Sequence, residues 1–128
     1  MKLNRIHHVA VIASDYARSK RFYAEVLGLK VVAETYREER DSWKLDLAVG
    51  GDYQIELFTF PGAPERPSYP EARGLRHLAF EVDDVDAAAA ELRGKGTEVE
   101  AVRVDPVTGK KFVFFADPDG LPLELYER

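Results

Sequence analysis

The chain has 128 residues, 45% of them hydrophobic and 32% charged, a composition that suits one compact domain but not two independent ones. Its formal net charge of −5 argues against a general binder of nucleic-acid phosphates, which needs an excess of basic surface. The absence of cysteine excludes disulfides, thiolate ligands and a thiol nucleophile. No apolar run resembles a signal peptide or a membrane span, so we expect a cytoplasmic protein with small-molecule partners and no nucleic-acid or membrane partner.

The first half of the chain predicts a strand, a helix and three further strands. Residues 6–12 are typical of a strand, Ser14 or Asp15 can cap the helix, and Gly28 ends it. Residues at helical spacing form one largely apolar face of this helix: Ser19, Phe22, Tyr23, Val26 and Leu27. Strand-like runs follow near 29–36, 43–49 and 53–60, and a Gly50-Gly51-Asp52 turn predicts that the last two form a hairpin.

The second half repeats this order. It predicts a strand at 76–82, a helix from about Asp84, and strands near 98–104, 111–116 and 121–127, with an Asp117-Pro118-Asp119-Gly120 turn before the last. Between the halves, proline recurs every third residue from Pro61 to Pro70, which is typical of a stiff linker. We therefore predict one α+β domain, residues 1–128, with tandem βαβββ modules at about 4–60 and 74–128 and a linker at 61–73.

The repeat also duplicates chemically useful side chains. His8 and His77 stand 69 residues apart in equivalent strands, and Glu56 and Glu124 stand 68 apart. Alone, a strand histidine or glutamate is more often a hydrogen-bonded or solvated residue than a ligand. Two imidazoles and two carboxylates in matched places suit a divalent, five- or six-coordinate metal with positions left for substrate. We predict that His8, Glu56, His77 and Glu124 bind the metal, with His7 as the alternative to His8.

Strand alternation supports this choice, because successive side chains point to opposite faces. One parity is apolar and suits packing against the two helices: Val9, Val11, Ile55, Leu57, Leu78, Phe80, Val82, Leu123 and Leu125. The other parity carries the four candidate ligands together with small and aromatic residues: Ala10, Ala79, Phe58, Phe60 and Tyr126. We expect this second face to line a pocket.

These segments resemble the vicinal oxygen chelate superfamily over nearly the whole chain. The resemblance rests on the His8 strand, the helix ending Phe22-Tyr23-Ala24-Glu25-Val26-Leu27-Gly28, the Ile55-Glu56-Leu57 strand, Gly74-Leu75-Arg76-His77, and Asp117-Pro118-Asp119-Gly120 with Leu123-Glu124-Leu125. It implies curved mixed sheets that enclose one metal ion: nickel, zinc, cobalt, manganese or iron. The ordered set His, Glu, His, Glu is similar to glyoxalase I.

The resemblance implies a metal-dependent lyase or isomerase that moves a proton between adjacent carbons of a hemithioacetal-like substrate. Glu124 is then the expected base, and Glu56 a ligand and possible partner base. An epimerase, a thiol transferase, an extradiol dioxygenase and a metal-free drug-sequestering protein remain alternatives on the same fold. We also expect a homodimer, because small modules with exposed sheet edges favour pairing.

The substrate is not fixed by the resemblance. Glutathione-using glyoxalases commonly carry an arginine four residues after the first histidine and an asparagine four after the first glutamate, where this chain has Ile12 and Phe60. Ordinary glutathione adducts are therefore not the expected substrate. Arg37, Arg40, Trp43 and Lys44 can contact a substrate, although plain surface charge or, for Trp43, core packing explains them equally well or better. Arg103, Lys110 and Lys111 can add positive potential at the pocket mouth, but surface charge explains them better and they are not taken as site residues.

Overall fold

The chain forms two compact units with similar sheets. The computed structural model describes residues 1–128 apart from the side chain of Tyr53. Its contacts divide at the proline-rich segment into unit 1, Met1–Pro64, and unit 2, Glu65–Arg128. The described helices include none long and apolar enough to cross a membrane.

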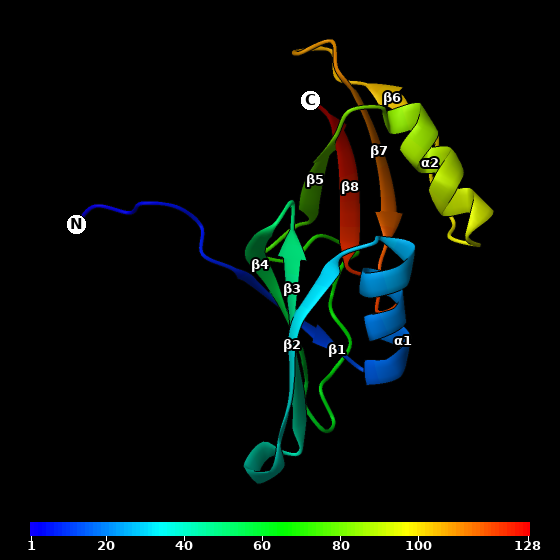
Figure 1. Ribbon diagram of the computed structural model, residues 1–128. Helices are drawn as coiled ribbons and strands as arrows, with labels where there is room; N and C mark the ends of the chain where they lie inside the picture. The colour runs from blue at the N-terminus through cyan, green and yellow to red at the C-terminus, as the bar shows by residue number, and fades with distance from the viewer. The chain divides into compact units, whose positions relative to one another are not determined.

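Unit 1 is a four-stranded mixed sheet with one helix (Figure 1). Its sheet order is β1-β4-β3-β2, with β1 parallel to β4 and the other pairs antiparallel. A single π-helical turn continues the first helix. The elements in chain order are β1 (Val9–Ala13), α1 (Tyr16–Arg21), η1 (Phe22–Val26), β2 (Lys30–Arg37), η2 (Glu38–Arg40), β3 (Ser42–Val49) and β4 (Asp52–Thr59).

The predicted helix signals act where the sequence places them. Asp15 caps α1, because its Oδ1 accepts the backbone N–H of Arg18 at 3.1 Å. Ser19 and Tyr23 on the predicted face are fully buried. Gly28 has a φ of 74°, a left-handed conformation that ends the helical segment at low steric cost.

Unit 2 repeats the architecture. Its sheet order is β5-β8-β7-β6, again with the first pair parallel, and α2 packs against β7 and β8 (Figure 1). Asp84 caps α2 through a 2.9 Å bond from the backbone N–H of Ala87. The elements are β5 (Leu78–Val82), α2 (Val85–Gly94), β6 (Arg103–Val104), β7 (Lys111–Ala116) and β8 (Pro122–Glu127).

One predicted strand is wrong in extent. The pattern at 98–104 predicts a full strand, but only Arg103–Val104 and an isolated bridge from Val99 to Phe115 pair with β7. The carbonyl of Glu100 instead accepts a 2.8 Å hydrogen bond from Arg93 Nη2 of α2. The edge strand is therefore interrupted near Glu100, whose backbone carbonyl is hydrogen-bonded to a side chain of α2.

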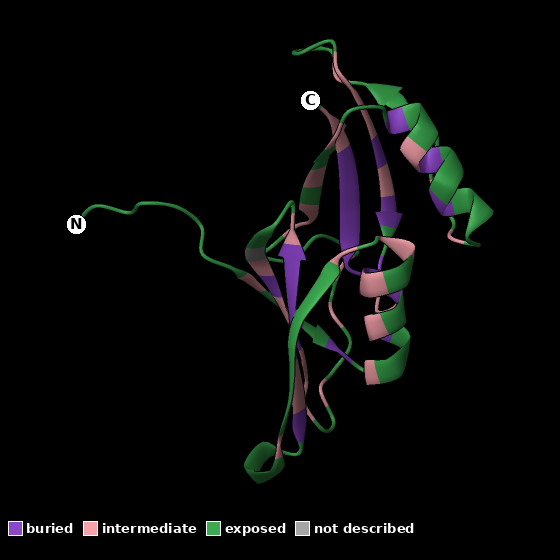
Figure 2. Ribbon diagram, viewed as in Figure 1, coloured by how far each residue is buried: buried purple, intermediate pink, exposed green. Residues whose placement is uncertain are grey.

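Burial alternates with the predicted strand parity in β1 and β5, whereas in β8 both parities are buried from Pro122 to Leu125 (Figure 2). In unit 1 the buried side chains include Val11, Leu45, Leu47, Ile55 and Leu57, and in unit 2 they include Val113, Phe115, Leu123 and Leu125. This confirms the α+β class with paired βαβββ modules. The opposite face of each sheet, which carries the candidate ligands, is the functional candidate.

Candidate metal centre

In unit 1 the parallel pairing of β1 and β4 brings His8 to Glu56. Ala10 lies directly beside Glu56 in the register, and His8, two residues earlier, shares its parity. Nε2 of His8 lies 3.3 Å from Oε2 of Glu56. The Glu56 side chain is only 12% exposed, whereas that of His8 is 38% exposed and faces outward at the entry to the strand.

Unit 2 reproduces this geometry. Ala79 of β5 lies beside Glu124 of β8 in the same parallel register, and His77 again stands two residues before the alanine. Nε2 of His77 lies 3.0 Å from Oε2 of Glu124, whose side chain is 11% exposed. Each unit therefore pairs one imidazole with one largely buried carboxylate in the same way.

The surroundings of the two carboxylates differ. In unit 1, Lys44 Nζ lies 3.3 Å from Glu56 Oε1 and 3.0 Å from Asp46 Oδ1, so a lysine joins two carboxylates on this face. Asp46 stands directly opposite Glu56 in the β3–β4 register. The pair in unit 1 is thus part of a charged cluster, in which a cation already neutralises part of the buried negative charge.

Aromatic rings occupy the matching positions in unit 2. Phe114 stands opposite Glu124 in the β7–β8 register, and Phe112 stands opposite Tyr126. The ring of His77 meets that of Phe114 edge to face, with centroids 5.0 Å apart. Glu124 consequently has His77 as its one ion-pair partner among the described residues. The Glu124 carboxylate therefore has phenylalanine side chains as its neighbours on β7, which we call the aromatic wall of unit 2.

The donors fit a divalent transition metal. Imidazole nitrogen and carboxylate oxygen are the ligands that nickel, zinc, cobalt, manganese and iron accept in proteins. Within the described part of the chain the candidate donors occur as pairs, not as groups of three or more histidine, aspartate or glutamate side chains. Each unit therefore offers half of the four-residue set that the sequence predicts.

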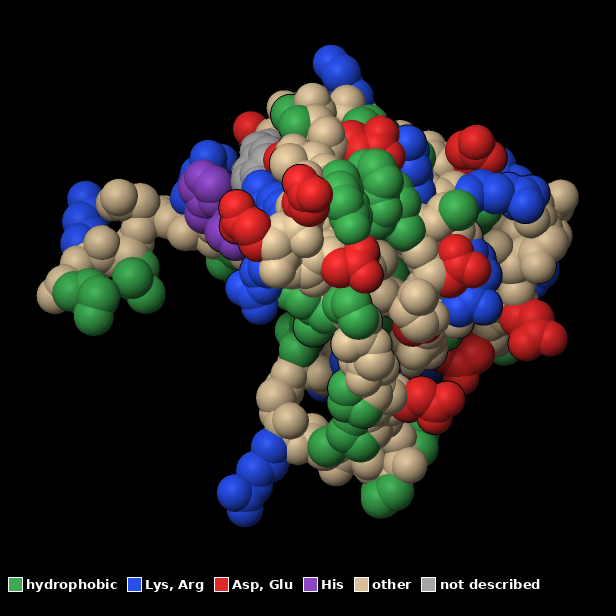
Figure 3. Space-filling model, turned by 90° about the horizontal axis from the view of Figure 1, so that it is seen from below, with side chains coloured by type: hydrophobic (Ala, Val, Ile, Leu, Met, Phe, Trp, Pro, Cys, Tyr) green, Lys and Arg blue, Asp and Glu red, His purple; other side chains and the backbone are tan. Residues whose placement is uncertain are grey.

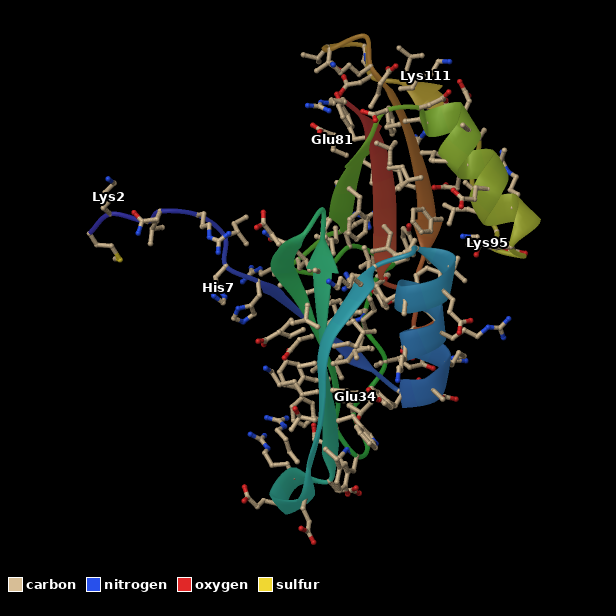
Figure 4. All side chains as sticks on the ribbon, viewed as in Figure 1. Lys2, His7, Glu34, Glu81, Lys95 and Lys111 are labelled. Atoms are coloured by element: carbon tan, nitrogen blue, oxygen red, sulfur yellow. The ribbon has the colours of Figure 1, made fainter. Side chains whose placement is uncertain are left out.

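His7 and His8 both precede β1, which begins at Val9 and not at the predicted residue 6. His7 stands where the exposed N-terminal segment meets β1 (Figure 4), and its Nδ1 lies 2.9 Å from Nδ1 of His8. Histidine side chains at this point reach the surface in the space-filling view (Figure 3). The 3.3 Å contact with Glu56 belongs to His8, which supports the choice of His8 over His7 as the ligand candidate.

The other predicted substrate-contact residues of unit 1 lie on opposite faces of its sheet. Arg37 pairs with Ser42 in the β2–β3 register, on the face that carries Lys44 and Glu56. Trp43 belongs to the opposite face, where its ring stacks on Tyr16 of α1 at 4.7 Å. Trp43 is therefore a packing residue, and it does not form a wall beside the candidate ligands.

The cationic candidates of unit 2 are two lysines with structural contacts and one arginine on the ligand-bearing face. Lys110 Nζ donates to the carbonyl of Arg128, and Lys111 Nζ pairs with Asp86 at 2.5 Å, which raises the pKa of Lys111. These contacts explain both lysines as structural. Arg103 instead lies over two rings on the ligand-bearing side, 4.9 Å from the Phe112 centroid and 5.6 Å from that of Phe114.

Sequence reasoning missed Asp46, Phe112 and Phe114. The same parity rule that selected the glutamates could have found them, because these residues alternate with the buried Leu45, Leu47, Val113 and Phe115. The signal was overlooked because parity was applied only to the strands that carry the candidate ligands. These residues make the two carboxylate environments unequal.

Comparison with known proteins gives a family-level match. The model of the Glyoxalase/Bleomycin resistance protein/Dioxygenase superfamily matches residues 5–125. The chain is 63% identical over 126 residues to the uncharacterized protein YaeR of Escherichia coli K12, covering 98% of both chains. A crystal structure of a glyoxalase family protein from Enterococcus faecalis superposes with a TM-score of 0.90 at 52% identity, covering 99% of this chain and 100% of that one.

A more distant relative has a named activity. The chain is 32% identical over 131 residues to the lactoylglutathione lyase of Salmonella typhimurium LT2, covering 96% of this chain and 92% of that protein. The likeness extends across both βαβββ units of this chain.

Proposed function

Because the chain belongs to the Glyoxalase/Bleomycin resistance protein/Dioxygenase superfamily, we propose that it is a metal-dependent lyase or isomerase of the glyoxalase I type. Its reaction moves a proton between adjacent carbons of a small α-hydroxycarbonyl, such as the hemithioacetal of an α-ketoaldehyde. The observation that carries the proposal is the His–Glu pair repeated in the same register in both units. The likeness to a lactoylglutathione lyase supports the reaction class.

In this proposal His8, Glu56, His77 and Glu124 hold one divalent ion. When bound, the ion would draw negative charge from oxygens on two adjacent substrate carbons, which acidifies the C–H bond of the carbon that bears the hydroxyl. Four protein donors leave coordination positions open for these oxygens. A drug-sequestering protein has no need of two matched pairs of metal donors, so the pairs favour an enzyme over that alternative.

Glu124 is the proposed base. Its carboxylate accepts the proton from one substrate carbon and returns it to the neighbouring carbon, while the hydroxyl proton passes from the first carbon's oxygen to the second carbon's oxygen, so that the net change is an isomerisation. The phenylalanine rings around Glu124 exclude water from this transfer, and the contact with His77 orients the carboxylate. Glu56 stays a ligand in this proposal, because its contact with Lys44 makes it less available to accept a proton.

The test measures metal content and turnover in the purified protein. Metal-free chain is loaded in turn with nickel, zinc, cobalt, manganese and iron, and methylglyoxal hemithioacetals of several thiols are supplied as substrates. We expect about one ion per four-residue set and isomerisation of at least one adduct. Stoichiometric metal without turnover of any α-ketoaldehyde adduct would contradict the assignment.

We also propose that the protein is a homodimer. The outer strands β1 and β2 of one sheet, and β5 and β6 of the other, have one unpaired side within their sheets. Such edges pair readily with another chain. Light scattering during gel filtration should give about twice the chain mass of 14.4 kDa, and a monomer mass at micromolar concentration would contradict this.

A further inference from the structure

We propose that Arg37 and Arg40 form a subsite for an oxyanion of the substrate on the face of unit 1 that carries His8 and Glu56. The substrate is then a small α-hydroxycarbonyl that also bears a carboxylate or a phosphate. This inference rests on the proposed function, since it adds a substrate class to the same site.

The Arg37 side chain is held in place before any ligand binds. Its guanidinium carbon lies 4.9 Å from the ring centroid of Phe58 and 5.5 Å from that of Phe60. Nη2 also donates a 2.8 Å hydrogen bond to Oγ of Ser42, which is fully buried. Stacking and this bond fix the plane of the fork, a geometry that suits bidentate binding of carboxylate or phosphate oxygens.

Arg40 adds a second guanidinium to the same rings. Its guanidinium carbon lies 5.1 Å from the Phe60 centroid, on the 3-10 turn that follows β2. The rings of Phe58 and Phe60 stack on each other at 5.9 Å. Two cations therefore share one aromatic platform, and their charges repel unless an anion lies between or beside them.

Neither arginine has a carboxylate partner in the described part of the chain. Arg37 Nε is buried without a hydrogen-bond partner, which leaves a costly unpaired donor on this face. Two exposed arginines of the same chain do have carboxylate partners: Arg21 pairs with Glu25, and Arg128 lies within 4 Å of Glu81 and Asp83. The nearby Lys44 is already bound to Asp46 and Glu56.

The strand register sets the distance from the metal pair. Phe58 follows Glu56 by two residues on the same face of β4, which places the ring about 7 Å further along the strand. Phe60, the ring that both guanidiniums contact, lies two residues further on, so an oxyanion held by the arginines and two oxygens near Glu56 belong to a molecule that spans about 7 to 13 Å. Two arginines in a chain of net charge −5 do not make a surface for a polyanion such as nucleic acid.

The first experiment measures anion binding without metal and without turnover. The Nε–Hε resonance of Arg37 in the full-length, metal-free protein is followed by NMR during titration with inorganic phosphate and, separately, with succinate. We expect a saturable shift with at least one of them. Arg37→Gln and Arg40→Gln should each weaken this binding about tenfold or more, because each removes a charge-assisted contact.

The matched control is Arg21→Gln, which removes the same charge from an arginine that already has a partner. It should bind the anions as the wild-type chain does. No saturable shift with either anion, or equal weakening in the control, would overturn the subsite. If Arg37→Gln fails to fold by circular dichroism, Arg40→Gln and Arg37→Lys carry the test, the latter keeping the charge but losing the planar fork.

The two probes separate the possible sources of the oxyanion. Stronger binding of phosphate points to a phosphorylated substrate, and stronger binding of succinate points to a carboxylated one. On any turned-over adduct that carries a carboxylate or a phosphate, Arg37→Gln should raise KM about tenfold while the bound metal stays constant. Anion binding without turnover contradicts the proposed function alone, whereas turnover of such an adduct with unchanged KM in Arg37→Gln contradicts the subsite alone.

Discussion

The ammonium group of Lys44 lies 3.3 Å from Oε1 of Glu56, on a face where unit 2 carries Phe112 at the matching position. A lysine this close neutralises the carboxylate but also competes with a metal ion for it. In the proposed site, a metal ion that takes Oε1 of Glu56 would therefore have to displace Lys44. The aromatic wall of unit 2 imposes no such competition.

We predict that Lys44→Met binds a divalent metal several-fold more tightly than the wild-type chain. The methionine keeps the length and apolar stem of the side chain while removing the competing charge. Metal affinity measured against a chelator of known strength checks this. Lys20→Met is the matched control, because Lys20 pairs with Glu34 and not with a candidate ligand. Unchanged or weaker affinity in Lys44→Met would show that the lysine does not compete.

The two glutamates should give different losses. Glu124→Gln removes the proposed base from the aromatic wall of unit 2 and should lower kcat by about 100-fold or more while most of the metal remains bound. Glu56→Gln should lower metal affinity more than it lowers kcat at saturating metal. Glu91→Gln, on the exposed face of α2, is the control. Full turnover in Glu124→Gln would remove this residue from the base role.

Adjacent histidines allow a matched test of the ligand choice. His8→Ala should lose most metal affinity, because Nε2 of His8 lies 3.3 Å from Oε2 of Glu56, whereas His7→Ala should keep it. Metal content after dialysis distinguishes them, and His77→Ala should match His8→Ala. Retention of metal in His8→Ala together with its loss in His7→Ala would transfer the assignment to His7.

Strand parity and duplication made much of this fold predictable from the sequence. Both operate through local geometry: alternate residues share a face, and Asp15 and Asp84 cap helices through their own backbone neighbours. The break in the strand at 98–104 was not predictable in this way. It depends on Arg93, which takes the carbonyl of Glu100 from the next element, and strand patterns carry no such tertiary information.

The candidate site was predictable only in part, for the same reason. Sequence could select Glu56 and Glu124 as equivalents, since the repeat preserves their register. It could not show that Lys44 contacts Glu56 or that Arg37 stacks on two rings, because both contacts join different strands. Trp43 was ambiguous until its stacking on Tyr16 placed it on the helix side of the sheet.

The cap of α2 should contribute measurably to stability. Asp84 Oδ1 accepts the backbone N–H of Ala87, so Asp84→Ala leaves a helix-terminal donor without its partner. We expect a loss of about 1 kcal/mol in the free energy of unfolding, measured by urea denaturation. Asp83→Ala, at an exposed neighbouring position, is the control and should change stability by less than about 0.5 kcal/mol. Equal effects would assign the loss to charge and not to capping.

A final prediction concerns pH. Two side chains of α1 contact Glu34 of β2: Tyr16 Oη donates to Glu34 Oε1 at 2.5 Å, and Lys20 Nζ lies 3.0 Å from the same atom. The hydrogen bond from Tyr16, and then that from Lys20, lower the pKa of Glu34 below its usual value of 4.5. Burial, followed by the contact with Glu34, raises the pKa of Tyr16. A lowered carboxyl pKa stabilises the fold above about pH 4.5, and this contribution is lost as the pH falls through the folded-state value.

Tyr16→Phe should therefore raise the pKa of Glu34 toward 4.5 and make the acid-side loss of stability shallower, while the ring still stacks on Trp43. An NMR titration of the Glu34 carboxyl carbon gives the pKa, and unfolding curves between pH 3 and 7 give the stability. Tyr36→Phe removes a comparable hydroxyl, which donates to Asp41, and should leave the Glu34 titration unchanged. If both variants titrate Glu34 alike, Lys20 and not Tyr16 sets its pKa, because the lysine is then the only partner left to stabilise the charged form.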